Sequence, residues 1–411
     1  MPLQPTVAAI ASNSPLGDLG WQGVSADDPD VEALRATLAA EAGIKGLEVV
    51  DPQEPHYAKR AAAIFRRDGF VLVKDVLSEE QLARVRSGCD TVIRGIVERD
   101  PTMTSNRGSH RYSFGSTPAF FGQHHAWAAM IEPERLHEVL REIWGSDGFI
   151  CTSGANNGGD FVLPGCVEYQ HLHRDMGDFF PKAAAQSGKG MAGNTNRDVV
   201  ADWRDTPPPV IVCNFPMEIV QGSPIAHTAV NGATRQIPGT QSSRSDIPTL
   251  AEEPRWMKLS TTAPAPAGAA MIRDIRAWHV STPARNQSCI SSTVCTLVSA
   301  PWPSHVRTKA LTTVLTNTLF AVLSLGQGGT PNVSNTVRGI PCSVWHAPWF
   351  AQGSGGARTM PWDTYAKLSP KAQLYCRYLV QGEEDPTPNW SPPKFGAATD
   401  GAVVKQTVAK M

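Results

Sequence analysis

The chain has 411 residues, of which 41% are hydrophobic and 18% charged, and this composition is typical of a soluble globular protein with a core of normal size. Its 37 Lys and Arg residues balance 38 Asp and Glu residues, so nothing in the charge indicates a nucleic acid or an anionic membrane as a partner. The eight cysteines form no C-x-x-C pair, and the N-terminus lacks a charged region followed by a long apolar one. We therefore expect reduced thiols and a cytoplasmic location.

The N-terminal part of the chain is predicted to be mainly helical. Residues 1–55 are rich in Ala, Pro, Gly, Ser and Asp and are expected to form an extension that packs on the main domain. Ser78 followed by Gln81 has the spacing of a capping box, which indicates the start of a helix. The segments predicted here are helices from Asp30 to Ala42, from Tyr57 to Asp68, after Ser78 and from Pro133 to Trp144, and a strand from Phe70 to Val73.

Short apolar runs separated by Gly, Pro and Asn clusters follow from Ile150 to Ala300, as all-β architecture requires. We expect a mainly β fold with flanking helices (α+β), namely a double-stranded β-helix or jelly-roll barrel buttressed by the N-terminal helices. The predicted domain covers residues 56–305. Its polar segment from about residue 182 to 209 lacks periodicity and is interpreted as a lid-like insertion, the alternative being disorder.

Residues 306–411 are expected to form a helix and an irregular cap on the same domain. The segment from Thr312 to Gly326 is almost uncharged, but it is shorter than the roughly 20 apolar residues that a membrane span needs. A buried helix is therefore the preferred interpretation of this segment.

Three residues have the chemistry of a metal site. His173 and Asp175 form an H-x-D pair, and His279 ends the alternating run that begins at Met271. Two histidines and one carboxylate are the ligands of non-haem Fe(II) oxygenases, and residues two apart on a strand share a face. We interpret the run from Met271 to His279 as one strand. The alternative for the H-x-D pair is a surface strand with a titrating histidine and a solvated aspartate.

The chain resembles the phytanoyl-CoA dioxygenase family of Fe(II)/2-oxoglutarate-dependent oxygenases, especially its branch in specialised metabolism. The resemblance covers roughly residues 60 to 305 and implies Fe(II), 2-oxoglutarate and O₂ as cofactors, with ascorbate supportive in vitro. It implies a small-molecule substrate and a monomer or homodimer, with neither nucleic acid nor membrane as partner. It rests on four ordered segments: Phe65 to Val73, Gln170 to Asp175, Asn231 to Thr240 and Arg273 to His279.

The resemblance also implies residues that bind 2-oxoglutarate. Gln170 and Thr234 would hydrogen-bond the co-substrate. An arginine is expected about eleven residues after the distal histidine, where it would grip the far carboxylate with two hydrogen bonds. Ile290 occupies that position, so Arg285 is the candidate, the alternative being an ordinary solvated turn arginine. Arg276 is a weaker candidate, because an unbroken strand would place it on the face opposite His279.

The sequence says least about the substrate. Candidates for the pocket wall are His171, Phe215, Met217 and Trp278, each of which could equally be structural. The basic residues Arg174, Arg235 and Arg273 would suit an acidic substrate, or they serve solubility.

Three functions stay open at this point. The first is oxidation of an unactivated C–H bond of a small metabolite by hydroxylation, and the second is the same cofactor chemistry ending in desaturation or oxidative cyclisation. The third is a non-catalytic jelly-roll binding protein, which the missing arginine suggests and the complete metal triad disfavours. In the family, halogenating relatives replace the carboxylate of the triad, so Asp175 argues against halogenation.

Overall fold

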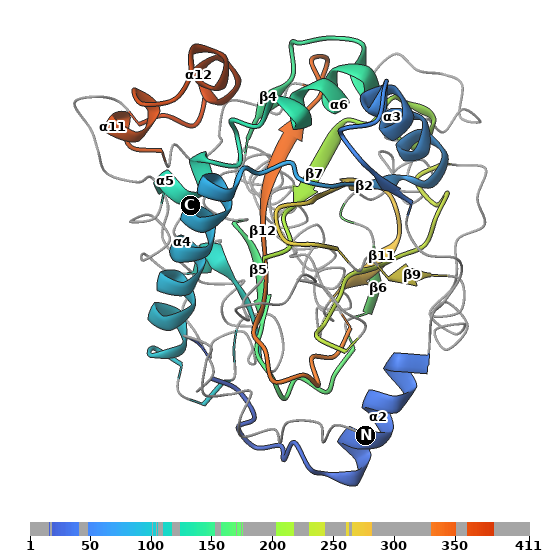
Figure 1. Cartoon of the computed structure of the whole chain (residues 1–411), viewed down its shortest axis with the longest axis vertical. Coiled ribbons are helices and arrows are strands. Elements are labelled where there is room, and N and C mark those ends of the chain that lie inside the picture. Colours follow the sequence, from blue (N-terminus) through green and yellow to red (C-terminus); the bar gives the residue numbers. More distant parts are fainter. Residues whose placement is uncertain are drawn as a thin grey trace, which may run out of the picture.

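The computed structural model describes residues 16, 19–40, 48–100, 102–103, 105, 110–116, 124–152, 158–169, 171–173, 175, 203–217, 230–242, 260–262, 265–281, 330–350 and 360–381. Two sheets form the centre of this part of the chain (Figure 1). The large sheet has the order β1 (Val49–Val50), β2 (Phe70–Val73), β10 (Ala270–Asp274), β7 (Val210–Asn214), β12 (Arg338–His346), β5 (Gly159–Val162) and β3 (Arg111–Ser113), and β4 (Ile150–Cys151) pairs with β12. The small sheet has the order β6 (His171–His173), β11 (His279–Ser281), β8 (Arg235–Gln236) and β9 (Thr261–Thr262).

From β5 to β12 the chain passes repeatedly between the two sheets. Strands β5, β7, β10 and β12 belong to the large sheet, and β6, β8, β9 and β11 belong to the small one. This winding is the jelly-roll topology and confirms the predicted fold class. Strand β12, which lies between β7 and β5 at the centre of the large sheet, follows residue 305. The predicted boundary of the barrel at residue 305 therefore needs correction, because one of its strands, β12, lies at Arg338–His346.

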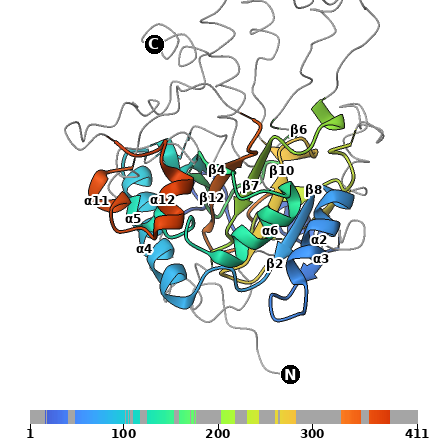
Figure 2. The same ribbon diagram turned by 90° about the horizontal axis from the view of Figure 1, so that it is seen from above.

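The helices begin and end where local sequence signals place them. Helix α3 ends at Gly69, whose φ of 84° suits a left-handed C-cap, and the Ser78–Gln81 capping box is present at the start of α4. Helices α3 and α6 lie next to each other (Figure 1), and α11 lies beside α5 (Figure 2). The bounds are α2 Pro29–Ala40, α3 Tyr57–Asp68, α4 Glu79–Val97, α5 His124–Ala128, α6 Glu134–Trp144, α11 Trp362–Tyr365 and α12 Pro370–Cys376, with short 3-10 turns at Phe114–Ser116 and Trp203–Asp205.

The two faces of the large sheet have different surroundings, because successive side chains on a strand point to opposite faces. On β12, Trp345 belongs to the main core, which includes buried side chains of α3, α4 and α6. Cys342 and Val344 belong to a separate cluster with Val212. We call the face that carries this second cluster the inner face.

The inner face is the side of the large sheet that contacts the small sheet. The Nε2 atom of Gln236 on β8 lies 3.9 Å from Sδ of Met271 on β10. Met271 pairs in register with Asn214, and Asn214 pairs with Cys342. Arg338 is four residues before Cys342 on the same strand, so it shares this inner face.

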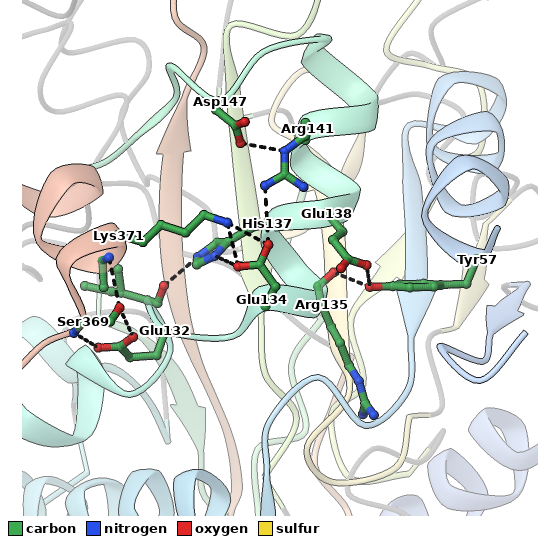
Figure 3. A network of polar contacts seen from close by, with 12 residues as sticks. Tyr57, Glu132, Glu134, Arg135, His137, Glu138, Arg141, Asp147, Ser369 and Lys371 are labelled. Atoms are coloured by element: carbon green, nitrogen blue, oxygen red, sulfur yellow. Dashed lines mark hydrogen bonds and ion pairs between the residues drawn. The ribbon is translucent and has the colours of Figure 1, made fainter. Parts of the chain in front are cut away.

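The C-terminal segment 360–381 is fixed to α6 and to the residues that flank it by polar contacts (Figure 3) and by aromatic contacts. Ser369 donates from its backbone nitrogen and its Oγ to the Glu132 carboxylate, at 2.8 and 2.6 Å. Lys371 Nζ lies 2.7 Å from both carboxylate oxygens of Glu134. Tyr375 is buried and stacks on Phe149, with ring centroids 4.7 Å apart.

The packing of Tyr375 should contribute more to the free energy of unfolding than the ion pair between Lys371 and Glu134. Truncation of the buried ring in Tyr375→Ala should lower the free energy of unfolding by about 3 kcal/mol or more, because it leaves a cavity among aromatic rings. Lys371→Ala should lower it by less than about 1 kcal/mol, because both partners are partly exposed to water. Urea unfolding of the two variants measures the difference, and equal losses would contradict this assignment.

Candidate functional site

Strands β6 and β11 bring together two of the three expected metal ligands in the backbone ladder. His173 and His279 are opposed residues of an antiparallel pair, and Ser281 pairs with His171. The partner of His279 on its other side is Gln236 of β8. The two histidines, 106 positions apart in the sequence (279 minus 173), are therefore neighbours in the small sheet.

Asp175, the third expected ligand, is buried and held by the large sheet. Its backbone nitrogen donates to the carbonyl oxygen of Ile275 at 3.0 Å. Its Oδ2 atom accepts a hydrogen bond of 2.7 Å from Nη2 of Arg273, and the side-chain exposure of this pair is 9% and 0%. The alternative of a solvated aspartate on a surface strand is therefore wrong.

The run from Met271 to His279 is not one strand, and the prediction that it is must be corrected. Strand β10 ends at Asp274, a turn follows, and β11 begins at His279 in the other sheet. Asp274 closes the turn: its Oδ1 accepts from the backbone nitrogen and the Nε of Arg276, both at 2.9 Å, and its Oδ2 lies 2.6 Å from Arg276 Nη2. Strand alternation therefore does not determine the direction of Arg276, which is committed to this turn.

Among the side chains that the structure describes, no group of three His, Cys, Asp or Glu residues is placed to hold a metal ion. His173 and His279 are described by their backbone pairing, and Asp175 is the ligand candidate whose side chain is described. The metal triad therefore stays a prediction that the ladder register and the burial of Asp175 support.

Of the residues expected to bind 2-oxoglutarate, Thr234 lies within the described part of the chain. It is 1% exposed, and its Oγ1 has no hydrogen-bond partner among the described residues. Gln170 and Arg285 lie outside the described residues, as do most of the predicted lid and the predicted helix from Thr312 to Gly326.

One arginine of the barrel interior is absent from the residues that the sequence predicted. Arg338, the first residue of β12, is fully buried, and none of its three guanidinium nitrogens has a hydrogen-bond partner among the described residues. Burial, followed by the nearby Arg111, lowers the pKa of Arg338 to about 9, while Asp160 acts in the opposite direction. The side chain is therefore still charged at neutral pH. A buried charge of this kind is costly unless an anion pairs with it.

Arg338 lies close to the segment that contains Thr234. A Cβ atom added at Gly232, where φ is 88°, would lie 3.4 Å from Nε of Arg338. The spacing rule of the family missed Arg338 because it follows His279 by 59 residues (338 minus 279) instead of about eleven. The signal in the sequence was a charged residue that opens the buried nine-residue strand Arg338–His346.

The expected substrate-pocket residues have differing environments. Phe215 and Met217 are buried in the main core that includes the helices, which favours the structural alternative for both. Trp278 is partly exposed, and its backbone nitrogen donates to Thr240 Oγ1 at 2.9 Å. His171 is described by its backbone in β6.

Two of the three basic residues expected near the site are engaged by the protein. Arg273 holds Asp175, and Arg235 Nε donates to Ser260 Oγ at 2.7 Å. Arg174 lies outside the described residues. The described arginines therefore do not support an acidic substrate.

The family model for phytanoyl-CoA dioxygenase (PhyH) matches residues 65–290, which is more than half of the chain. The chain belongs to the phytanoyl-CoA dioxygenase family. The family consists of non-haem Fe(II)/2-oxoglutarate-dependent oxygenases, and this is the enzyme class of the chain. The resemblance seen in the sequence is thereby confirmed.

Solved structures of low sequence identity are also similar. AviO1 from Streptomyces viridochromogenes Tue57 is 15% identical, with a TM-score of 0.39, over 72% of this chain and 96% of that one. SnoK, a non-heme alpha ketoglutarate dependent carbocyclase from nogalamycin biosynthesis, is 12% identical, with a TM-score of 0.37, over 74% and 88%. EctD from S. alaskensis is 14% identical, with a TM-score of 0.35, over 74% and 83%.

A search of curated proteins found no match. Within the described ranges, no helix has the length and apolar character that crossing a bilayer requires.

Burial of His346 should make the stability of the protein sensitive to acid. His346 lies on the inner face of β12 and is 2% exposed, and burial lowers its pKa to about 4. The unfolded chain takes up a proton on His346 near pH 6.5, and the folded chain does so only near pH 4. The contribution of neutral His346 to the free energy of unfolding is therefore fully present above pH 6.5 and is lost as the pH falls toward 4.

His346→Leu should therefore reduce the slope of the unfolding free energy against pH between about 6.5 and 4, by at most about 1.4 kcal/mol per pH unit. Urea unfolding at a series of pH values provides the measurement. Identical slopes in the wild type and the variant would contradict the prediction.

Proposed function

We propose that this oxygenase oxidises an unactivated C–H bond of a small metabolite, in the biosynthesis of a specialised natural product. The family membership carries the enzyme class. The observation that supports an anionic co-substrate in this barrel is the buried guanidinium of Arg338, which has no hydrogen-bond partner among the described residues. When bound, Fe(II) and 2-oxoglutarate supply activation of O₂, with succinate and CO₂ as the products of the co-substrate.

His173, Asp175 and His279 would hold the iron. Opposed residues of an antiparallel ladder share a face of the sheet, so the register of His173 and His279 supports their convergence. Asp175 adds a buried carboxylate oxygen. Two imidazoles and one carboxylate leave coordination positions for the co-substrate and O₂, which is the donor set that non-haem Fe(II) requires.

Arg338 would anchor the far carboxylate of 2-oxoglutarate, and we propose it in place of Arg285. A guanidinium matches a carboxylate with two parallel hydrogen bonds, and the three nitrogens of Arg338 have no partner in the described part of the chain. The buried Oγ1 of Thr234, also unpartnered there, would donate a further hydrogen bond. The dianionic co-substrate would then compensate the buried charge of Arg338.

The binding-protein alternative loses its motivation with this assignment. It was suggested by the absence of an arginine about eleven residues after His279, and Arg338 would supply the guanidinium from the next described strand of the chain, in the other sheet. The chain's own residues would hold the co-substrate in a fixed orientation and exclude bulk water from the buried inner face.

Succinate release with Fe(II), 2-oxoglutarate, O₂ and ascorbate over a panel of small metabolites tests the proposed function. The product mass then separates hydroxylation, a gain of one oxygen atom, from desaturation or cyclisation, a loss of two hydrogen atoms. Absence of substrate-dependent turnover across the panel, with metal and co-substrate bound, would favour the binding-protein alternative.

Variants of the two arginines test the anchor. Arg338→Met should raise the apparent KM for 2-oxoglutarate about 10- to 100-fold, which corresponds to the loss of a charged hydrogen bond. It should also raise the melting temperature of the apoprotein, because a buried charge without a partner is removed. Addition of 2-oxoglutarate with Mn(II) should stabilise the wild type and leave the variant unchanged.

Arg285→Ala is the competing variant and should leave the KM for 2-oxoglutarate near the wild-type value. A raised KM in Arg285→Ala together with an unchanged KM in Arg338→Met would return the anchor to Arg285.

A further inference from the structure

The ion pair between Arg273 and Asp175 joins the large sheet to the proposed metal triad. Nη2 of Arg273 donates to Oδ2 of Asp175 at 2.7 Å. Arg273 comes from the penultimate position of β10, and Asp175 follows β6 of the small sheet. Both groups are buried, so water does not weaken the contact.

The surrounding backbone and side chains fix the position of Arg273. Its backbone lies between Phe70 of β2 and Val212 of β7 in the sheet register. Its Nε lies 3.4 Å from Oδ1 of Asn214, and its Nη1 has no partner among the described residues. A guanidinium held in this way offers Asp175 a hydrogen bond from one defined direction.

We propose that Arg273 is a positioning residue that holds one oxygen of the Asp175 carboxylate and so leaves the other, Oδ1, for the metal. This inference rests on the proposed function. A carboxylate can bind a metal through one oxygen or through both, and a second oxygen would occupy a position that the co-substrate needs. The charge-assisted hydrogen bond to Oδ2 opposes that second contact.

The competing explanation is that the pair only ties the two sheets together. The chain offers a matched control in Asp274 and Arg276, a second buried ion pair with Nη2 and Oδ2 2.6 Å apart. This pair closes the turn after β10 and includes none of the proposed ligands. Loss of either arginine should reduce stability, but only loss of Arg273 should change how the metal-loaded protein binds 2-oxoglutarate.

The experiment uses the full chain without O₂. Fe(II) is kept at a saturating concentration, so that a change in metal affinity does not alter the measured affinity for 2-oxoglutarate. Titration with 2-oxoglutarate is followed by the visible charge-transfer absorption that arises when a keto acid chelates Fe(II). Arg273→Gln should weaken binding of 2-oxoglutarate about 10- to 100-fold, the usual effect of removing a group that orients a metal ligand, and should shift the absorption maximum.

Arg273→Lys, which keeps one charged donor, should recover part of the affinity, and Arg276→Gln should match the wild type in both affinity and absorption maximum. Urea unfolding of each variant shows whether it is folded. If Arg273→Gln does not fold, Arg273→Lys alone tests whether Arg273 positions Asp175. Binding and absorption in both Arg273 variants equal to those of Arg276→Gln would overturn the inference and leave the proposed function intact. A wild-type protein that binds Fe(II) and 2-oxoglutarate without the absorption band, or does not bind them, would overturn both.

Discussion

The site depends on the turn that carries the chain from β10 in the large sheet to β11 in the small one. Asp274 and Arg276 close this turn with hydrogen bonds between 2.6 and 2.9 Å, inside a region that excludes water. Because the turn is closed, β11 starts at His279, which is where the ladder to His173 begins. The same turn presents the carbonyl of Ile275 to the backbone nitrogen of Asp175. The hydrogen bond from the backbone nitrogen of Arg276 to Asp274 Oδ1 does not need the guanidinium. The turn itself thus brings residues of three distant segments together.

Two arginines on the inner face of the large sheet, Arg273 and Arg338, differ in what compensates their charge. Arg273 has a carboxylate from the protein at 2.7 Å, whereas Arg338 has no hydrogen-bond partner in the described part of the chain. A buried charge is costly unless an opposite charge lies against it. The difference agrees with the two proposed roles, in which Arg273 organises the site and Arg338 binds an anion that arrives from outside.

Local signals in the sequence predicted the longer helices α2, α3, α4 and α6, but not the short helices α5, α11 and α12. Gly69, Ser78 and Gln81 act within one turn of the chain, and the helix ends that they predict are present. The broken strand could not be predicted from alternation, because the Asp274–Arg276 side-chain closure competes with continued pairing only in the folded barrel. Arg338 could not be found by spacing, because residues 282–337 separate it from β11, and only the sheet order places β12 beside β7.

The charge of the inner face of β12 changes along the strand, and this distribution indicates which kind of substrate the face can accept. Arg338 lies at its start, Cys342 and Val344 form an apolar cluster in the middle, and His346, uncharged at neutral pH because burial lowers its pKa to about 4, lies at its end. An anion is therefore favoured only at the Arg338 end. Arg273 is occupied by Asp175, and Arg111, which shares a face with Arg338, donates to the carbonyl oxygens of Glu168 and Thr330. With the dianionic co-substrate on Arg338, each of these arginines would have an assigned partner. A neutral metabolite fits this distribution of charge better than the acidic one that the basic residues near the site first suggested.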